Sequence, residues 1–238
     1  MPTPSSCGVR VPPWYVAGPI SSAAVDDPRR WVILDVGETI IDETRVWETW
    51  ADVLGVPRAT FRGALRAVLA EGGDHRSVLE RFGGSRWHER AAEVESAYGG
   101  FRRDDLYPDA IRAIAGLGQA GYQIAVLANQ PATRAAELEA VGVRVDVMAM
   151  SEALGVHKPD PAFFARALEL LGDPPASDVA YVGDRIDNDI RPARGAGMRA
   201  VWIRRGPWGA LREDRGGDAH LVVRSLDELV ERIGGVWA

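Results

Sequence analysis

Four short segments, in this order along the chain, most constrain the fold of this 238-residue sequence: WVILDVGETI (31–40), LANQ (127–130), HKPDP (157–161) and YVGDRIDNDI (181–190). Three of them place an acid or amide cluster where a short apolar run ends. Four short, continuously apolar runs are typical of strands that are buried on both faces of a parallel sheet: WVIL (31–34), QIAVLA (123–128), VAYV (179–182) and AVWI (200–203). Because ligands bind outside the carboxyl ends of such strands, we expect the polar clusters to meet in one crevice.

Amphipathic segments separate the apolar runs, so strand and helix patterns alternate along the chain. Two helical faces can be recognised, that of Ile111, Ile114 and Leu117 and that of Phe164, Leu168 and Leu171. The alternation favours an α/β fold, with a Rossmann-like, doubly wound parallel sheet and right-handed crossovers. The chain is long enough for one well-buried core and a small second lobe.

Residues 44–106, between the first two strands, are too many for one crossover and contain no strand-like run. They have the pattern of several amphipathic helices separated by glycine pairs. We expect an inserted helical cap domain here, because an insert after the first strand stands over the carboxyl edge of the sheet. A purely structural helical subdomain is the alternative. The catalytic core is then expected to comprise residues 29–43 and 107–238.

The composition argues against several classes of partner. The formal net charge of −6 provides no basic footprint for nucleic acid and no attraction to anionic membranes. One cysteine, Cys7, excludes internal disulfides, and no apolar run approaches the length of a membrane span. Residues 1–28 are rich in Pro and Ser and lack the apolar stretch of a signal peptide, so we expect a mobile or surface-packed extension of a cytoplasmic protein.

Four acids and one lysine are expected to meet in the crevice: Asp35, Asp184, Asp187, Asp189 and Lys158. So many carboxylates repel one another unless a cation holds them. Oxygen-only ligands favour Mg²⁺, so a magnesium site is expected at this edge of the sheet. Asp187 is an extra acid, for which a solvated or helix-capping role is the alternative.

The order and identity of these residues resemble the haloacid dehalogenase-like hydrolase superfamily, most of whose members are Mg²⁺-dependent phosphatases. The family has four motifs: a strand followed by Asp-x-Asp-x-Thr, a Ser or Thr usually followed by Asn, a Lys commonly in Lys-Pro-Asp-Pro, and Gly-Asp with an acid five residues after the Asp. This chain matches them at Asp35-Val36-Gly37-Glu38-Thr39, at Ala128-Asn129, at Lys158-Pro159-Asp160-Pro161, and at Gly183, Asp184 and Asp189. The match covers roughly residues 30–205 in order, which makes it far more specific than any single motif.

The resemblance implies a role for each matched residue. Asp35 would be the nucleophile that forms an aspartyl-phosphate, and also a metal ligand. From its position alone, a turn aspartate is the alternative. Asp184 would bind the cation directly, and Asp189 would support it and hold Lys158. Lys158 would screen Asp35 from the phosphoryl group, while Thr39 would hydrogen-bond the phosphoryl oxygens or cap the turn after Asp35.

Gly37 stands where the family has its second aspartate. In the family's phosphatases the backbone carbonyl of that residue binds the metal, and its carboxylate protonates the leaving group and later activates water. Gly37 keeps the carbonyl and lacks the carboxylate, so general acid–base catalysis, typically worth ~10²–10⁴ in rate, is expected to be lost. Alkyl phosphates should then be poor substrates unless the substrate or Glu38 supplies the proton, and Glu38 reaches inward only if the chain turns there.

Ala128 is the second departure, because the family has Ser or Thr there to hydrogen-bond the transferred phosphoryl group. The lost bond to a charged acceptor is worth about 1.5–3 kcal/mol. Asn129 and backbone amides are the expected replacements. Both departures affect groups that handle the phosphoryl, while the nucleophile and metal positions are intact.

Substrate contacts are expected from Arg45, Trp47 and Trp50, which follow the first motif, although these side chains could also pack the insert. The leading hypothesis is a Mg²⁺-dependent hydrolase, a phosphatase of a small phosphorylated metabolite that acts through a covalent intermediate on Asp35. Two alternatives remain: a catalytically weakened or inactive relative that binds a ligand or partner, and a hydrolase of another bond such as carbon–phosphorus. A metal-free dehalogenase does not fit, since Asp184 and Asp189 look arranged to hold a metal.

Overall fold

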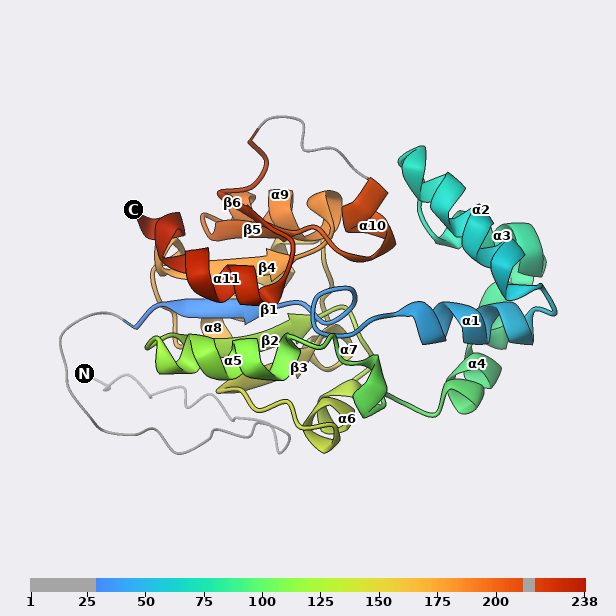
Figure 1. Cartoon of the computed structure of the whole chain (residues 1–238), viewed down its shortest axis with the longest axis horizontal. Coiled ribbons are helices and arrows are strands. Elements are labelled where there is room, and N and C mark those ends of the chain that lie inside the picture. Colours follow the sequence, from blue (N-terminus) through green and yellow to red (C-terminus); the bar gives the residue numbers. More distant parts are fainter. Residues whose placement is uncertain (1–28, 212–216) are drawn as a thin grey trace, which may run out of the picture.

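The computed structural model describes residues 29–211 and 217–238 of the chain (Figure 1). The expected extension, residues 1–28, lies outside the described residues, as does Cys7. Within the described part, no helix has both the length and the apolarity needed to cross a lipid bilayer.

Six parallel strands form one sheet in the order β3-β2-β1-β4-β5-β6. The strands are β1 (Trp31–Leu34), β2 (Gln123–Ala128), β3 (Val147–Met150), β4 (Val179–Gly183), β5 (Arg199–Ile203) and β6 (Leu221–Val223). The four predicted strands are β1, β2, β4 and β5, and the structure adds the two edge strands. The chain runs outward from β1 to β3 on one side and from β4 to β6 on the other. The strand order therefore reverses between β1 and β4, which is where ligands bind in sheets of this kind.

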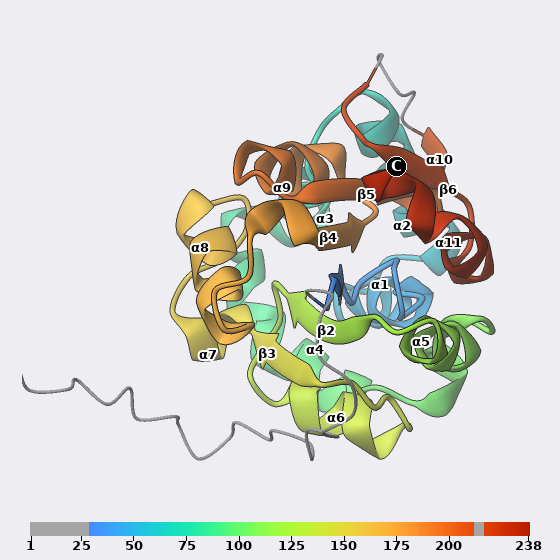
Figure 2. The same ribbon diagram turned by 90° about the vertical axis from the view of Figure 1, so that its left-hand side faces the viewer.

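Helices cover both faces of the sheet (Figure 2). The helical segments of the core are α5 (Ala110–Gln119), α6 (Arg134–Ala140), α7 (Ser151–Leu154), α8 (Pro161–Leu170), η3 (Ala176–Asp178), η4 (Ile186–Ile190), α9 (Arg191–Gly195), α10 (Gly206–Leu211), α11 (Leu226–Arg232) and η5 (Ile233–Trp237), while η2 (Arg103–Asp105) lies on the chain between the cap helices and α5. Alternate residues of β1 enter different cores: Val32 and Leu34 pack with α5 and α11, and Trp31 and Ile33 pack with α8 and α9. Burial on both faces explains why the strands are continuously apolar.

The residues after β1 form a separate helical layer beyond the end of the sheet (Figure 1). Its elements are α1 (Thr44–Val53), α2 (Arg58–Ala70), α3 (Arg76–Gly83), η1 (Gly84–Arg90) and α4 (Ala91–Tyr98). They bury their own small core, whose members include Phe61, Leu65 and Leu69 of α2. Trp208 of α10 belongs to the same cluster, so the cap packs against the rim of the sheet domain as well as being joined to it by the chain. The predicted α/β fold with an inserted helical cap is confirmed.

Candidate active site

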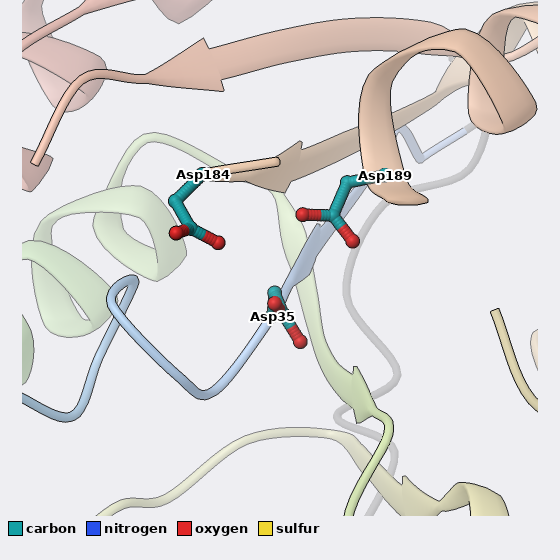
Figure 3. A group of neighbouring side chains, drawn as sticks. All are labelled: Asp35, Asp184 and Asp189. Carbon is teal, nitrogen blue, oxygen red and sulfur yellow. The ribbon is translucent and has the colours of Figure 1, made fainter. Parts of the chain in front are cut away.

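Three buried carboxylates meet where β1 and β4 end. Asp35 directly follows β1, Asp184 directly follows β4, and Asp189 lies in η4. Asp184 and Asp189 point toward a common space beside the end of β4, and Asp35 lies below them at the end of β1 (Figure 3). One carboxylate oxygen from each residue lies within 4.8 Å of the other two. The Asp35 N–H donates to the carbonyl of Val182 at 2.9 Å, which holds the ends of the two strands together.

Lys158 supplies the positive charge of this cluster and is only 2% exposed. Its Nζ lies 2.8 Å from Oδ1 of Asp35 and 2.6 Å from Oδ1 of Asp189. Burial alone would lower the pKa of Lys158, but the carboxylates of Asp189 and Asp35 outweigh it and hold that pKa well above its usual value. The other oxygen of Asp189 accepts the N–H of Arg185 at 2.9 Å. Asp189 therefore orients the lysine toward Asp35.

Asn129 fixes the loop that carries Lys158. Its Nδ2 donates to the Lys158 carbonyl and its Oδ1 accepts the Lys158 N–H, each at 2.8 Å. Since both ends of the amide are used on the backbone, Asn129 positions the lysine. The peptide bond between Lys158 and Pro159 is cis.

Asp184 has a buried oxygen, Oδ2, for which the described residues provide no hydrogen-bond partner. Burial, followed by the charges of Asp189 and Asp35, raises the pKa of Asp184 well above its usual value. A buried carboxylate oxygen without a donor is costly, and a cation that takes oxygen ligands would remove that cost. The residues present fit a hard divalent ion such as Mg²⁺, with the carboxylates of Asp35 and Asp184 and the carbonyl of Gly37 as candidate ligands.

Asp35 sits between opposing influences. Its pKa is raised to about 6, because burial and the charge of Asp189 raise it more than the charge of Lys158 lowers it. A divalent cation would add to the effect of Lys158 and keep this carboxylate ionised at neutral pH.

A tight turn follows Asp35, as Glu38 would need in order to face inward. Glu38 has a φ of 51°, and its buried carboxyl accepts a hydrogen bond from the hydroxyl of Tyr107. Burial raises the pKa of Glu38 to about 7, although the bond from Tyr107 opposes the shift. Thr39 is fully buried, and its Oγ1 has no partner among the described residues. Thr39 is also not among the residues that line the pocket.

Glu43, at the start of α1, is a pocket residue that the sequence did not reveal. Its carboxyl occupies the space beside Gly37: a Cβ added to Gly37 would lie 2.5 Å from Oε1 of Glu43. Burial, then the charges of Glu38 and Asp35, raises the pKa of Glu43 to about 8. The φ of Gly37 lies outside the left-handed region, so space, and not backbone conformation, favours glycine there.

A cavity of about 500 Å³ opens above the acid cluster, between the sheet domain and the cap. Its outer walls include Trp47 of α1, His75 and Arg76 at the start of α3, Arg185 after β4, and Trp208 of α10. The rings of Trp47 and Trp208 lie 5.8 Å apart. Their buried indole N–H groups have no acceptor among the described residues, so neither is committed to a hydrogen bond within the described part of the protein.

Of the three predicted substrate residues, only Trp47 lines this cavity. The guanidinium of Arg45 instead joins the two ends of the cap: it pairs with Asp105 and donates to the carbonyls of Tyr98 and Gly100, at 2.5–2.8 Å. Trp50 packs edge-on against Trp87 inside the cap, with ring centroids 5.6 Å apart.

Comparison with known proteins agrees with this architecture. A family model described as haloacid dehalogenase-like hydrolase matches residues 29–197. Phosphoserine phosphatase of Thermus thermophilus is 38% identical over 135 residues, which are 55% of this chain and 53% of that protein. Glyceraldehyde 3-phosphate phosphatase of Methanopyrus kandleri is 38% identical over 105 residues, 43% of this chain and 45% of that protein. The chain thus spans about half the length of these curated relatives.

Solved structures extend the likeness over most of the fold. A HAD phosphatase from Thermococcus onnurineus aligns with a TM-score of 0.57 and 24% identity, over 87% of this chain and 98% of that one. The putative HAD-hydrolase YfnB from Bacillus subtilis, solved with magnesium bound, aligns with a TM-score of 0.63 and 20% identity, over 86% and 98% of the two chains. At these identities the structures show a shared fold. The family match over residues 29–197 establishes that the chain belongs to the haloacid dehalogenase-like hydrolases.

Proposed function

We propose that this chain is a Mg²⁺-dependent phosphatase that transfers the phosphoryl group of a small phosphorylated metabolite to Asp35 and then to water. The observation that carries the proposal is the pairing of Asp35 with Lys158 at 2.8 Å, beside the unpartnered oxygen of Asp184, at the floor of the cavity. This arrangement supports a nucleophile, a fixed positive charge and a cation site within one enclosed space.

Each residue would act through its position. The Asp35 carboxylate attacks phosphorus, which splits one difficult displacement into two easier ones. Lys158 neutralises part of the charge that otherwise repels the phosphoryl oxygens from Asp35, and Asp189 and Asn129 keep the lysine in place. Mg²⁺, when bound, would neutralise further charge on those oxygens. The cap limits the entry of bulk water around the cluster.

A small substrate fits the size of the site. A cavity of about 500 Å³ is within the usual range for small-molecule pockets. Two relatives are named for phosphoserine and for glyceraldehyde 3-phosphate, which are both small phosphate esters. Trp47, Trp208 and Arg185 would contact the part of the substrate beyond the phosphoryl group.

The test is phosphate release from a panel of phosphate esters, with Mg²⁺ and with a chelator. We expect release only with Mg²⁺, and we expect Asp35→Asn to remove it, because the amide cannot form the aspartyl intermediate. Asp173→Asn is the matched control: Asp173 is exposed, follows α8, and has a φ of 56°, a conformation that Asn also tolerates. No release from any ester with Mg²⁺ would overturn the proposal, and retention of more than a few per cent of the rate by Asp35→Asn would overturn the covalent route.

A further inference from the structure

The structure offers a source for the proton that Gly37 cannot supply. When the P–O bond of an alkyl phosphate breaks, the departing oxygen needs a proton, and a carboxyl within hydrogen-bond reach is an efficient donor. Residue 37 follows Asp35 by two positions and lies at the pocket wall, but it has no side chain. The question is therefore which other carboxyl stands in that place.

The carboxyls on the cavity floor are already engaged. Asp35 is paired with Lys158 and is the proposed nucleophile, and Asp184 carries the oxygen suited to a cation. Glu38 accepts the Tyr107 hydroxyl and is pressed against the backbone of Gly206: a Cβ on Gly206 would lie 2.3 Å from Oε2 of Glu38. None of these three is free to face a departing oxygen.

The two acids at the rim are half-exposed and are held by neighbouring groups. Asp187 pairs with the guanidinium of Arg185 at 2.8 Å. Asp74 accepts the backbone N–H of Arg76 at 2.9 Å. Each has a side chain that is 42% exposed, so water surrounds it. Among the described acids that line the cavity, Glu43 is left.

Glu43 occupies the space in which a side chain of residue 37 would lie. The Cβ position of Gly37 is 2.5 Å from Oε1 and 2.7 Å from Cδ of Glu43, which is too close for both to be occupied. The carboxyl of Glu43 thus fills the space next to the second residue after Asp35, although it comes from the residue that precedes α1. The side chain of Gln130, which also lines the cavity, interacts with this carboxyl.

We propose that Glu43 replaces the missing side chain of residue 37 as the proton donor and acceptor of the reaction; this inference rests on the proposed phosphatase function. As the bond from Asp35 to phosphorus forms and the ester P–O bond breaks, the proton of Glu43 passes to the ester oxygen and the alcohol leaves. Glu43, now a carboxylate, takes a proton from water as the water oxygen bonds to phosphorus and the Asp35–phosphorus bond breaks. Ester and water give alcohol and phosphate, and Glu43 regains its proton.

Because Glu43 stands on the chain that enters the cap, its carboxyl is carried by the same segment as Trp47. Proton donation would therefore depend on the cap being seated over the substrate. A substrate that fits poorly and keeps the cap from closing would then lose both its contacts with the cap and the proton donor. An acid fixed at the sheet edge would not be lost in this way.

The test compares two classes of ester with one variant. Glu43→Gln keeps the shape of the side chain and removes the transferable proton. We expect its kcat for an alkyl phosphate to fall by ~10²–10⁴, and its kcat for an aryl phosphate with a good leaving group, such as 4-nitrophenyl phosphate, to fall less than about tenfold. The aryl rate in the same sample shows that the variant is folded and that Asp35 still reacts. Glu38→Gln is the comparison variant, for which we expect an unchanged ratio of alkyl to aryl rates.

A compensating pair tests the shared space directly. In Gly37→Asp alone, the new side chain is crowded by Glu43. Combining Gly37→Asp with Glu43→Ala places a carboxyl in the vacated space. The double variant should therefore hydrolyse alkyl phosphates at least tenfold faster than Glu43→Ala. Equal losses for both ester classes in Glu43→Gln, or no loss, would overturn the role of Glu43 while leaving the proposed phosphatase intact. Absence of activity toward every ester in the unmodified protein would overturn both.

Discussion

Replacing Lys158 by methionine should destabilise the Mg²⁺-free protein, and two distances set an upper limit on the amount. Lys158 is the single lysine of the sequence, and its Nζ lies 2.8 Å from Asp35 and 2.6 Å from Asp189. At an effective dielectric constant of about 20, each pair attracts by about 6 kcal/mol before desolvation is counted. Methionine has a similar volume, so the main effect is that two buried carboxylates lose their counter-charge.

The net cost should be smaller than the sum of the two attractions, because removing the ammonium also removes its own desolvation penalty. Breaking a buried ion pair by deleting one partner typically costs about 3–5 kcal/mol. For a chain of this size that corresponds to a fall in Tm of about 6–20 °C. The stability lost in Lys158→Met should be smaller at pH 5 than at pH 8, because Asp35, with a pKa of about 6, is largely neutral at pH 5.

Urea denaturation with a chelator present, at both pH values, measures the free energy of unfolding. Lys158→Arg is the matched variant: it keeps the charge, but the lysine side chain is only 1% exposed, so the larger guanidinium should be poorly accommodated and also destabilise. Millimolar Mg²⁺ should restore part of the stability of Lys158→Met by supplying positive charge beside Asp35. A loss below about 1 kcal/mol, or a loss that is the same at pH 5 and pH 8, would refute the electrostatic reasoning.

Three further predictions concern the acids and the cap. Asp184→Asn should abolish Mg²⁺-dependent activity, yet it should leave the Mg²⁺-free protein as stable as before or more stable, because burial penalises the charged carboxylate. Urea denaturation with a chelator present measures that stability. As pH rises from about 4 to about 8, the free energy of unfolding of the Mg²⁺-free protein should fall, because Asp35, Glu38 and Glu43 have folded-state pKa values of about 6, 7 and 8, above their usual values. The folded protein therefore binds more protons than the unfolded protein over that range, and a stability that stays constant or rises with pH would contradict the prediction. Arg45→Met removes the ion pair with Asp105 at the base of the cap, so it should loosen the cap and raise KM more than it lowers kcat. An unchanged KM in steady-state kinetics would argue that the cap does not depend on the contacts of Arg45.

The strands could be read from the sequence because burial on both faces leaves a local signature. WVIL and QIAVLA match β1 and β2 residue for residue. β3 and β6 were not predicted, although their residues, VMAM and LVV, are all apolar; both strands lie at the edges of the sheet, where burial is less complete. The polar clusters were assigned to one crevice for a topological reason: the carboxyl ends of parallel strands share an edge.

The directions of side chains in the cap could not be read in the same way. Arg45, Trp47 and Trp50 lie within six residues on one helix, yet they face the cap base, the cavity and the cap interior. Helical periodicity separates these faces, but it does not say which face meets the substrate, because that depends on how α1 is rotated against α2, α4 and the sheet edge.

The sequence by itself determined the parts of this site that are set by neighbours along the chain: Asp35 and Asp184 at the ends of β1 and β4, and Lys158 in the loop that Pro159 and Pro161 follow. Only the tertiary structure decided that Glu43 fills the space beside Gly37, and that both ends of the Asn129 amide bind the backbone of Lys158. The physical reason is that strand position follows from local burial, whereas the contact of one side chain with another depends on how separate elements pack and which space they leave open.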